Sequence, residues 1–192
     1  IQSGKCTELP AEACQFSYRD SVFKQSLKDK CIITQVTLRL STEANINIDY
    51  PALNAYFAAL EKEPTPQLVA DAVCEIRREK LPYPSELANV GSFFKNPVVT
   101  EIQFQNLLQE HPEMPHYRIS DSEVKIPAGW IIDRLGYKGT KRGAAGVHEH
   151  QALVLVNHGN ASGIEILTLA KEIQEKVLVN FKISLEIEVN IY

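Results

Sequence analysis

A segment rich in proline and glycine, residues 81–97 (LPYPSELANVGSFFKNP), constrains the fold of this chain more than any other feature. Pro82 and Pro84 exclude a helix there, because proline lacks an amide hydrogen and clashes with the preceding turn. Gly91 permits a backbone conformation, or a close approach, that a Cβ atom would hinder. We therefore expect a boundary between two lobes near Leu81.

Helical patterns occur on both sides of that boundary. Apolar residues recur at helical spacing, and the caps and first turns carry the residue types that favour helix ends. The expected helices are residues 52–63, 66–80 after a Thr65 cap, 101–110 after a Thr100 cap, 127–136 and 161–181.

Strand patterns alternate with these helices but do not follow a regular βαβ order. The expected strands are residues 31–40, rich in β-branched side chains, a weaker one at 46–50, then 122–126, 151–157 and 184–192. In the last strand Leu185, Ile187 and Val189 should face one way, and Glu186 and Glu188 the other. The irregular mixture predicts an α+β fold.

The size and charge of the chain exclude several classes of function. Its 192 residues can bury one good core or two small lobes. A formal net charge of −4 argues against a sequence-independent nucleic-acid partner. No apolar run approaches the ~20 residues of a membrane span, so no membrane association is expected. Because the chain starts at Ile1 without a signal segment, we expect a piece of a longer cytoplasmic protein.

Neither the cysteines nor the histidines form a ligand pattern. The four cysteines are scattered, which favours buried free thiols over a disulfide or a metal site. His148 and His150 alternate, but no further ligand lies at suitable spacing, so no metal is expected. The glycine-rich segment 138–146 lacks the residue order of a phosphate loop, which favours a mobile basic loop.

The segment GSFFKNP (91–97) carries the densest group of chemically useful residues. Ser92 follows a glycine, and Lys95 and Asn96 bring a cation and an amide suited to phosphate and polar ligand atoms. The alternative is a loop with two core phenylalanines and a solvated lysine.

Two further positions are candidates on local grounds. Arg19, in YRDSVFK (18–24), could bind a carboxylate through its planar fork, or pair with Asp20 on the surface. Glu188 lies among strand-forming residues, where a solvated carboxylate on an outer face is the alternative.

Taken together, the motifs carry more information than any one alone. YRDSVFK, LPYP, GSFFKNPVV, PAGWIIDRLGYKG, GVHEHQALVLVN and LEIEV cover nearly the whole chain. In this order they resemble the signatures of the UDP-N-acetylenolpyruvoylglucosamine reductase family of peptidoglycan synthesis.

The resemblance implies a flavoprotein oxidoreductase that acts on UDP-N-acetylglucosamine enolpyruvate, as a monomer. NADPH would reduce FAD, and the flavin would pass hydride to the enolpyruvyl group, giving UDP-N-acetylmuramate. Residues 1–81 would be a remnant of the FAD-binding lobe, 82–182 the substrate-binding domain, and 183–192 a strand that returns toward the FAD-binding lobe. The main FAD site would lie outside this chain, so that the fragment alone is inactive.

The resemblance also assigns roles to residues. Ser92 matches the general acid, and Arg19 and Glu188 match the residues that steady the enolate-like intermediate. Negative charge that develops on the substrate carboxylate would be stabilised by the guanidinium. Ile187 and Asn190 depart from the family pattern, which leaves open whether Glu186 or Glu188 acts. The expected substrate-binding residues are Tyr18, Tyr50, Lys80, Lys95, Asn96 and Gln151.

Two other functions remain open. The same substrate-binding residues would serve a non-catalytic module that binds a nucleotide sugar. In an unrelated α+β interaction domain, every motif would be structural. A glycine-rich FAD loop upstream of Ile1 would favour the enzyme over the binding module.

Overall fold

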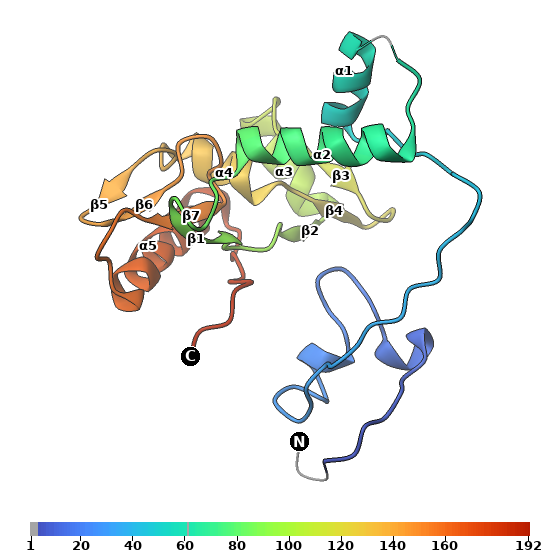
Figure 1. Ribbon diagram of the computed structural model, residues 1–192. Coiled ribbons are helices and arrows are strands. Elements are labelled where there is room, and N and C mark those ends of the chain that lie inside the picture. Colours follow the sequence, from blue (N-terminus) through green and yellow to red (C-terminus); the bar gives the residue numbers. More distant parts are fainter. Residues whose placement is uncertain (1–3, 61) are drawn as a thin grey trace. The chain divides into compact units, whose positions relative to one another are not determined.

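The computed structural model describes residues 4–60 and 62–192 and contains two compact units, one ending at Asn45 and one spanning Ile46–Tyr192 (Figure 1). Helices mix with two antiparallel sheets, and this confirms the predicted α+β class. The predicted lobe limits at 81 and 182 stay predictions.

The first unit is built from short turns. It holds two 3₁₀ helices, η1 (Ala11–Cys14) and η2 (Val22–Lys24), and an antiparallel bridge between Ser17 and Asp20. The strand predicted over residues 31–40 is wrong, because this segment is exposed and has no regular secondary structure. A strand requires a hydrogen-bonding neighbour, and none of the described residues pairs with this segment.

A pair of helices opens the second unit. Helix α1 (Pro51–Leu60) and helix α2 (Pro66–Lys80) share a small core of their own, around Phe57 and Ala72. As predicted, the Thr65 hydroxyl caps α2, accepting a hydrogen bond of 3.2 Å from the Leu68 amide. Residue 61 of the predicted first helix lies outside the described residues.

The strand predicted at residues 46–50 is also wrong. The Asn47 side chain accepts a hydrogen bond of 2.8 Å from the Asp49 amide. Such a turn is an alternative to strand pairing for the backbone.

The first sheet has the order β1-β7-β6-β5 and is antiparallel throughout. Helix α5 packs against β6 and β7 (Figure 1). The elements are β1 (Ala88–Ser92), β5 (Lys141–Arg142), β6 (Ala145–Val147), β7 (Val154–Asn157) and α5 (Gly163–Phe181).

The glycine-rich basic segment is a hairpin of β5 and β6, instead of the loop we predicted. Tyr137 and Arg142 both donate hydrogen bonds to Glu172 on α5, of 2.9 and 3.1 Å. Burial, followed by the bond to Glu172, raises the pKa of Tyr137 to about 12. These contacts anchor the hairpin to the helix.

The second sheet has the order β2-β4-β3, with α3 packed against β2 and β4. Thr100 caps α3 as predicted, and Ser162 caps α5 through a reciprocal pair with Glu165. The elements are β2 (Val98–Thr100), α3 (Glu101–Glu110), β3 (Tyr117–Arg118), β4 (Glu123–Lys125) and α4 (Ala128–Arg134).

One continuous core joins the two sheets to the helices that follow β1. Its largest buried side chains include Phe94, Phe104, Phe181 and Met114. Of the helices described, none combines the length and the apolar character that a bilayer crossing requires.

The cysteines differ from the prediction of buried thiols. All four are free in the structure, but only Cys14 is buried.

Candidate functional site

A bulge in β1 determines where Ser92 leaves the sheet. Asn89 pairs with Val156 and Ser92 with Val154, so β1 holds one residue more than β7 between these pairs. Gly91 lies in the bulge with φ +75°, in the left-handed region that favours glycine. The Asn89 side chain accepts a hydrogen bond of 2.9 Å from the Gly91 amide, which steadies the bulge. Ser92 is exposed at its end.

A cleft of about 510 Å³ opens beside this bulge, within the size range of small-molecule sites. Its walls come from the last turns of α2, the proline-rich segment and Gly91. Arg77 and Arg78 make it basic, and the Arg78 guanidinium donates a hydrogen bond of 3.0 Å to the Tyr83 hydroxyl. Such a cleft suits an anionic ligand.

The carboxy-terminal segment lies along the strand that continues from Ser92. The Lys95 amide donates to the Glu186 carbonyl, and the Glu188 amide donates to the Phe93 carbonyl, both at 2.9 Å. Among residues 4–60 and 62–192, this segment forms one bridge, Phe94 with Ile187, so the predicted strand over 184–192 is wrong beyond this point. The tertiary structure nevertheless brings the backbones around Ser92 and Glu188 side by side.

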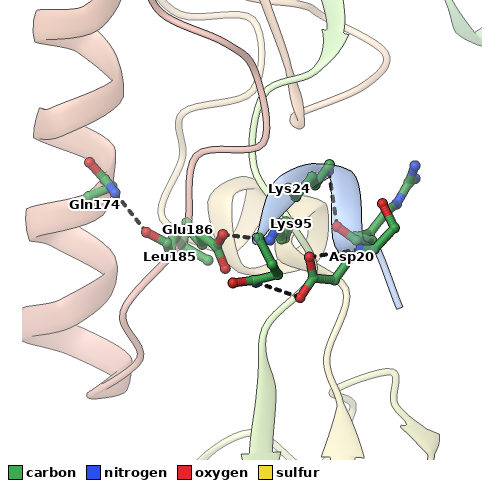
Figure 2. Close-up of polar contacts among 9 residues, drawn as sticks. Asp20, Lys24, Lys95, Gln174, Leu185 and Glu186 are labelled. Atoms are coloured by element: carbon green, nitrogen blue, oxygen red, sulfur yellow. Dashed lines mark hydrogen bonds and ion pairs between the residues drawn. The ribbon is translucent and has the colours of Figure 1, made fainter. Parts of the chain in front are cut away.

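Around the bridge, side chains of the carboxy-terminal segment alternate between buried and exposed, as predicted. Leu185 is 2% exposed, whereas the neighbouring Glu186 is exposed. The Glu186 carboxylate forms an ion pair of 2.5 Å with the Lys95 ammonium (Figure 2). Glu188 is half-buried.

Asn96 and Gln151 both lie next to the start of α4, although they are far apart in sequence. The Asn96 side-chain oxygen accepts a hydrogen bond of 2.9 Å from the Ala128 amide. The Gln151 side-chain oxygen lies so close to Gly129 that a Cβ atom there would approach it to 3.1 Å. Two predicted substrate-binding residues therefore share one end of a helix.

Tyr50 and Lys80 occupy the ends of the helix pair. Tyr50 is exposed directly before α1, and its carbonyl accepts a hydrogen bond of 3.0 Å from the Asn54 amide. Lys80 is the exposed last residue of α2, between two residues that line the cleft, Arg78 and Leu81.

Arg19 and Tyr18 lie in the first unit, in the turn closed by Ser17 and Asp20. Arg19 has φ +56°, uncommon for a residue other than glycine and often found where function dictates the backbone. The Lys24 ammonium donates a hydrogen bond of 3.0 Å to the Arg19 carbonyl (Figure 2). The turn is therefore stabilised by contacts within its own unit.

The comparisons with known proteins add to this geometry. A family model described as the carboxy-terminal domain of UDP-N-acetylenolpyruvoylglucosamine reductase matches residues 83–192. The chain belongs to this reductase family.

Two relatives carry the name UDP-N-acetylenolpyruvoylglucosamine reductase. The one from Paraburkholderia phymatum is 50% identical over 191 residues, covering 98% of this chain and 55% of the relative. The one from Pseudomonas aeruginosa is 45% identical over 195 residues, covering 100% of this chain and 56% of the relative. The chain thus spans about half the length of these reductases.

A solved structure shows a weaker likeness. The crystal structure of the reductase from Thermus caldophilus is 23% identical, with a TM-score of 0.42, over 68% of this chain and 37% of that one.

The reductase family implies FAD, and two features of the described residues do not fit its pyrophosphate. The glycine-rich segment forms the β5–β6 hairpin, so it does not cradle a pyrophosphate at a helix start. At the start of α5, the amides of Ser162 and Glu165 donate hydrogen bonds to each other's side chains. In residues 4–60 and 62–192, no group of three or more His, Cys, Asp or Glu could hold a metal ion.

Sequence reasoning missed several residues that shape the candidate site. Asn89 carried a weak sequence signal, because an asparagine side chain often accepts a hydrogen bond from the amide two residues later, here that of Gly91. Gln174, which donates a hydrogen bond of 2.6 Å to the Leu185 carbonyl, carried none, because its partner is a backbone atom of another segment. Arg78, which lines the cleft, was not singled out from the sequence.

Proposed function

We propose that this chain is the substrate-binding and proton-donating part of a cytoplasmic reductase that converts UDP-N-acetylenolpyruvoylglucosamine to UDP-N-acetylmuramate. The family and the names of the relatives support this assignment. The observation that carries it is the hydrogen bond from the Glu188 amide to the Phe93 carbonyl, next to Ser92. FAD and NADPH would supply the hydride from a site outside the described residues.

The proposed chemistry needs one proton and one stabilised negative charge. Hydride addition to the methylene carbon of the enolpyruvyl group leaves charge on the neighbouring carbon, delocalised into the carboxylate. Ser92 would give its proton to that carbon, because a strongly basic intermediate can take one from a weak acid. Arg19 would bind the carboxylate and stabilise the charge as it develops.

Glu188 is the better candidate of the two glutamates near the terminus. The Glu186 side chain is 67% exposed. Glu188 is half-buried, and its backbone is held beside Phe93. We therefore assign to Glu188 the polarisation of the intermediate.

The nucleotide sugar would lie along the basic cleft. Lys80 stands at the rim of this cleft, where an ammonium group could reach a diphosphate. Asn96 and Gln151, which lie next to the start of α4, would contribute amides to the sugar. Tyr18 and Tyr50 stay predicted substrate contacts. Lys95 was also predicted to contact the substrate, but its ammonium is directed at the Glu186 carboxylate.

Replacement of Ser92 by alanine in the full-length reductase tests the proposal. Reduction of the flavin by NADPH should remain within about twofold. Turnover of the enolpyruvyl substrate should fall by roughly 100-fold or more, the usual contribution of a positioned general acid. Stopped-flow absorbance measures both half-reactions separately.

Ser122→Ala, which removes a hydroxyl from the turn before β4, is the control and should leave both half-reactions unchanged. An equal loss in the two half-reactions of Ser92→Ala would exclude the role of general acid.

A further inference from the structure

The segment that carries Glu188 has little regular structure to hold it in place. One isolated bridge, Phe94 with Ile187, joins it to the strand that continues from β1. A single bridge contributes little stability, because short strand pairs are marginal in water. Side-chain contacts must therefore do much of the positioning.

Two such contacts are made by the residues two and three positions before Glu188. The Lys95 ammonium binds the Glu186 carboxylate at 2.5 Å, and only 19% of the Lys95 side chain is exposed. Gln174, from the middle of α5, donates a hydrogen bond of 2.6 Å to the Leu185 carbonyl (Figure 2). Charged partners make the first contact stronger than a neutral hydrogen bond. Burial shields the Lys95 end of this pair from solvent, whereas the Glu186 side chain is 67% exposed.

The two contacts join the carboxy-terminal segment to two different elements. Gln174 ties the segment to α5, and Lys95 ties it to the strand that follows Ser92. The Leu185 side chain, 2% exposed, is buried in the main core. Together they determine the position and direction of the chain two residues before Glu188.

We propose that Lys95, Glu186 and Gln174 are positioning residues, which hold Glu188 in register with Ser92. This inference rests on the proposed function and extends it to residues outside the reacting groups. It gives Lys95 a role different from direct contact with the substrate, since its ammonium is directed at a carboxylate of the protein.

A charge exchange distinguishes the two roles of Lys95. In the full-length reductase, Glu186→Gln should lower kcat on the order of tenfold, less than the ~100-fold that a 1 Å misplacement can cost. KM and flavin reduction by NADPH should stay within about twofold. The exchange Lys95→Glu with Glu186→Lys restores the ion pair, so it should recover most of kcat.

If Lys95 instead bound the substrate, the exchange would place a carboxylate against the diphosphate. KM would then rise by tenfold or more, and kcat would not recover. That result, or an unchanged kcat in Glu186→Gln, would overturn the positioning role.

A matched control is the ion pair of Arg118 with Glu101, at 2.8 Å in the second sheet. Glu101→Gln removes a similar charge and should leave kcat and KM unchanged. Gln174→Leu, which keeps the bulk but removes the donor, should lower kcat as Glu186→Gln does.

Amide hydrogen exchange tests the positioning role without activity. Exchange at the Glu188 amide, which is bonded to Phe93, should become at least several-fold faster in Glu186→Gln than in the Glu101→Gln control. If the wild-type protein shows no reductase activity, the proposed function fails, whereas unaltered exchange would refute the positioning role alone.

Discussion

At the scale of single residues, the backbone torsion of Gly91 controls how Ser92 leaves its strand. The φ of +75° is accessible to glycine, whereas an L-residue there pays about 1–2 kcal/mol. No atom lies within 4 Å of the position that an added Cβ would take. A side chain at residue 91 would therefore destabilise the fold through the backbone torsion and not through a steric clash.

Gly91→Ala should therefore lower the free energy of unfolding by about 1 kcal/mol, as measured by urea denaturation. If the bulge straightens to relieve the strain, Ser92 moves, and substrate turnover falls while flavin reduction is kept. Gly163→Ala, at the start of α5 with open space and an ordinary φ, is the control and should not destabilise. Equal stabilities of the two variants would contradict the strain at Gly91.

The residue scale also shows the reach of sequence reasoning. That glycine gives position 91 conformational freedom was predicted from its place in a proline-rich segment. The ion pair of Lys95 with Glu186 was not, because it depends on two segments that meet only in the folded chain.

At the scale of elements, helix α4 is capped by a residue from another part of the chain. Pro127, at its start, supplies no side-chain cap, and the Asn96 side chain accepts the hydrogen bond of the Ala128 amide instead. Asn96 therefore serves the fold, and under the proposed function it also serves the substrate.

Asn96→Ala should lower the stability by about 1 kcal/mol, as loss of a helix cap does. It should also raise KM, because the amide is lost to the substrate. Thr100→Ala removes the cap of α3 and is the matched control, with a similar decrease in Tm but an unchanged KM. If both variants changed Tm equally and neither changed KM, Asn96 would be a cap alone.

Helices were predicted well because their signals are local. Thr65 and Thr100 cap α2 and α3 as their positions in the sequence indicate. Residues 31–40 have the composition of a strand, yet the described residues give them no partner, and composition does not supply one. The hairpin of β5 and β6 was missed because its glycines and basic residues lack the alternation of strands.

At the scale of the whole molecule, this chain spans about half the length of its relatives. Its glycine-rich segment forms a hairpin. At the starts of α3 and α5, the side chains of Thr100 and Ser162 accept hydrogen bonds from backbone amides of the first turn. These features leave the pyrophosphate of a dinucleotide without a cradle among the described residues.

The isolated chain should therefore purify colourless, and added FAD should not remain bound through gel filtration. Visible absorbance of the protein peak measures this, with the full-length reductase as the yellow control. A stoichiometric amount of flavin on the isolated chain would show that these residues hold the cofactor after all.

The sequence by itself determined most of the helices, the caps of α2 and α3 and the order of motifs that marks the family, and it indicated the freedom of glycine at position 91, because each depends on neighbouring residues. Only the tertiary structure decided that Glu188 lies beside Phe93, that Lys95 binds Glu186, and that Asn96 caps α4. Contacts between distant segments depend on how the core packs, and no local pattern records that.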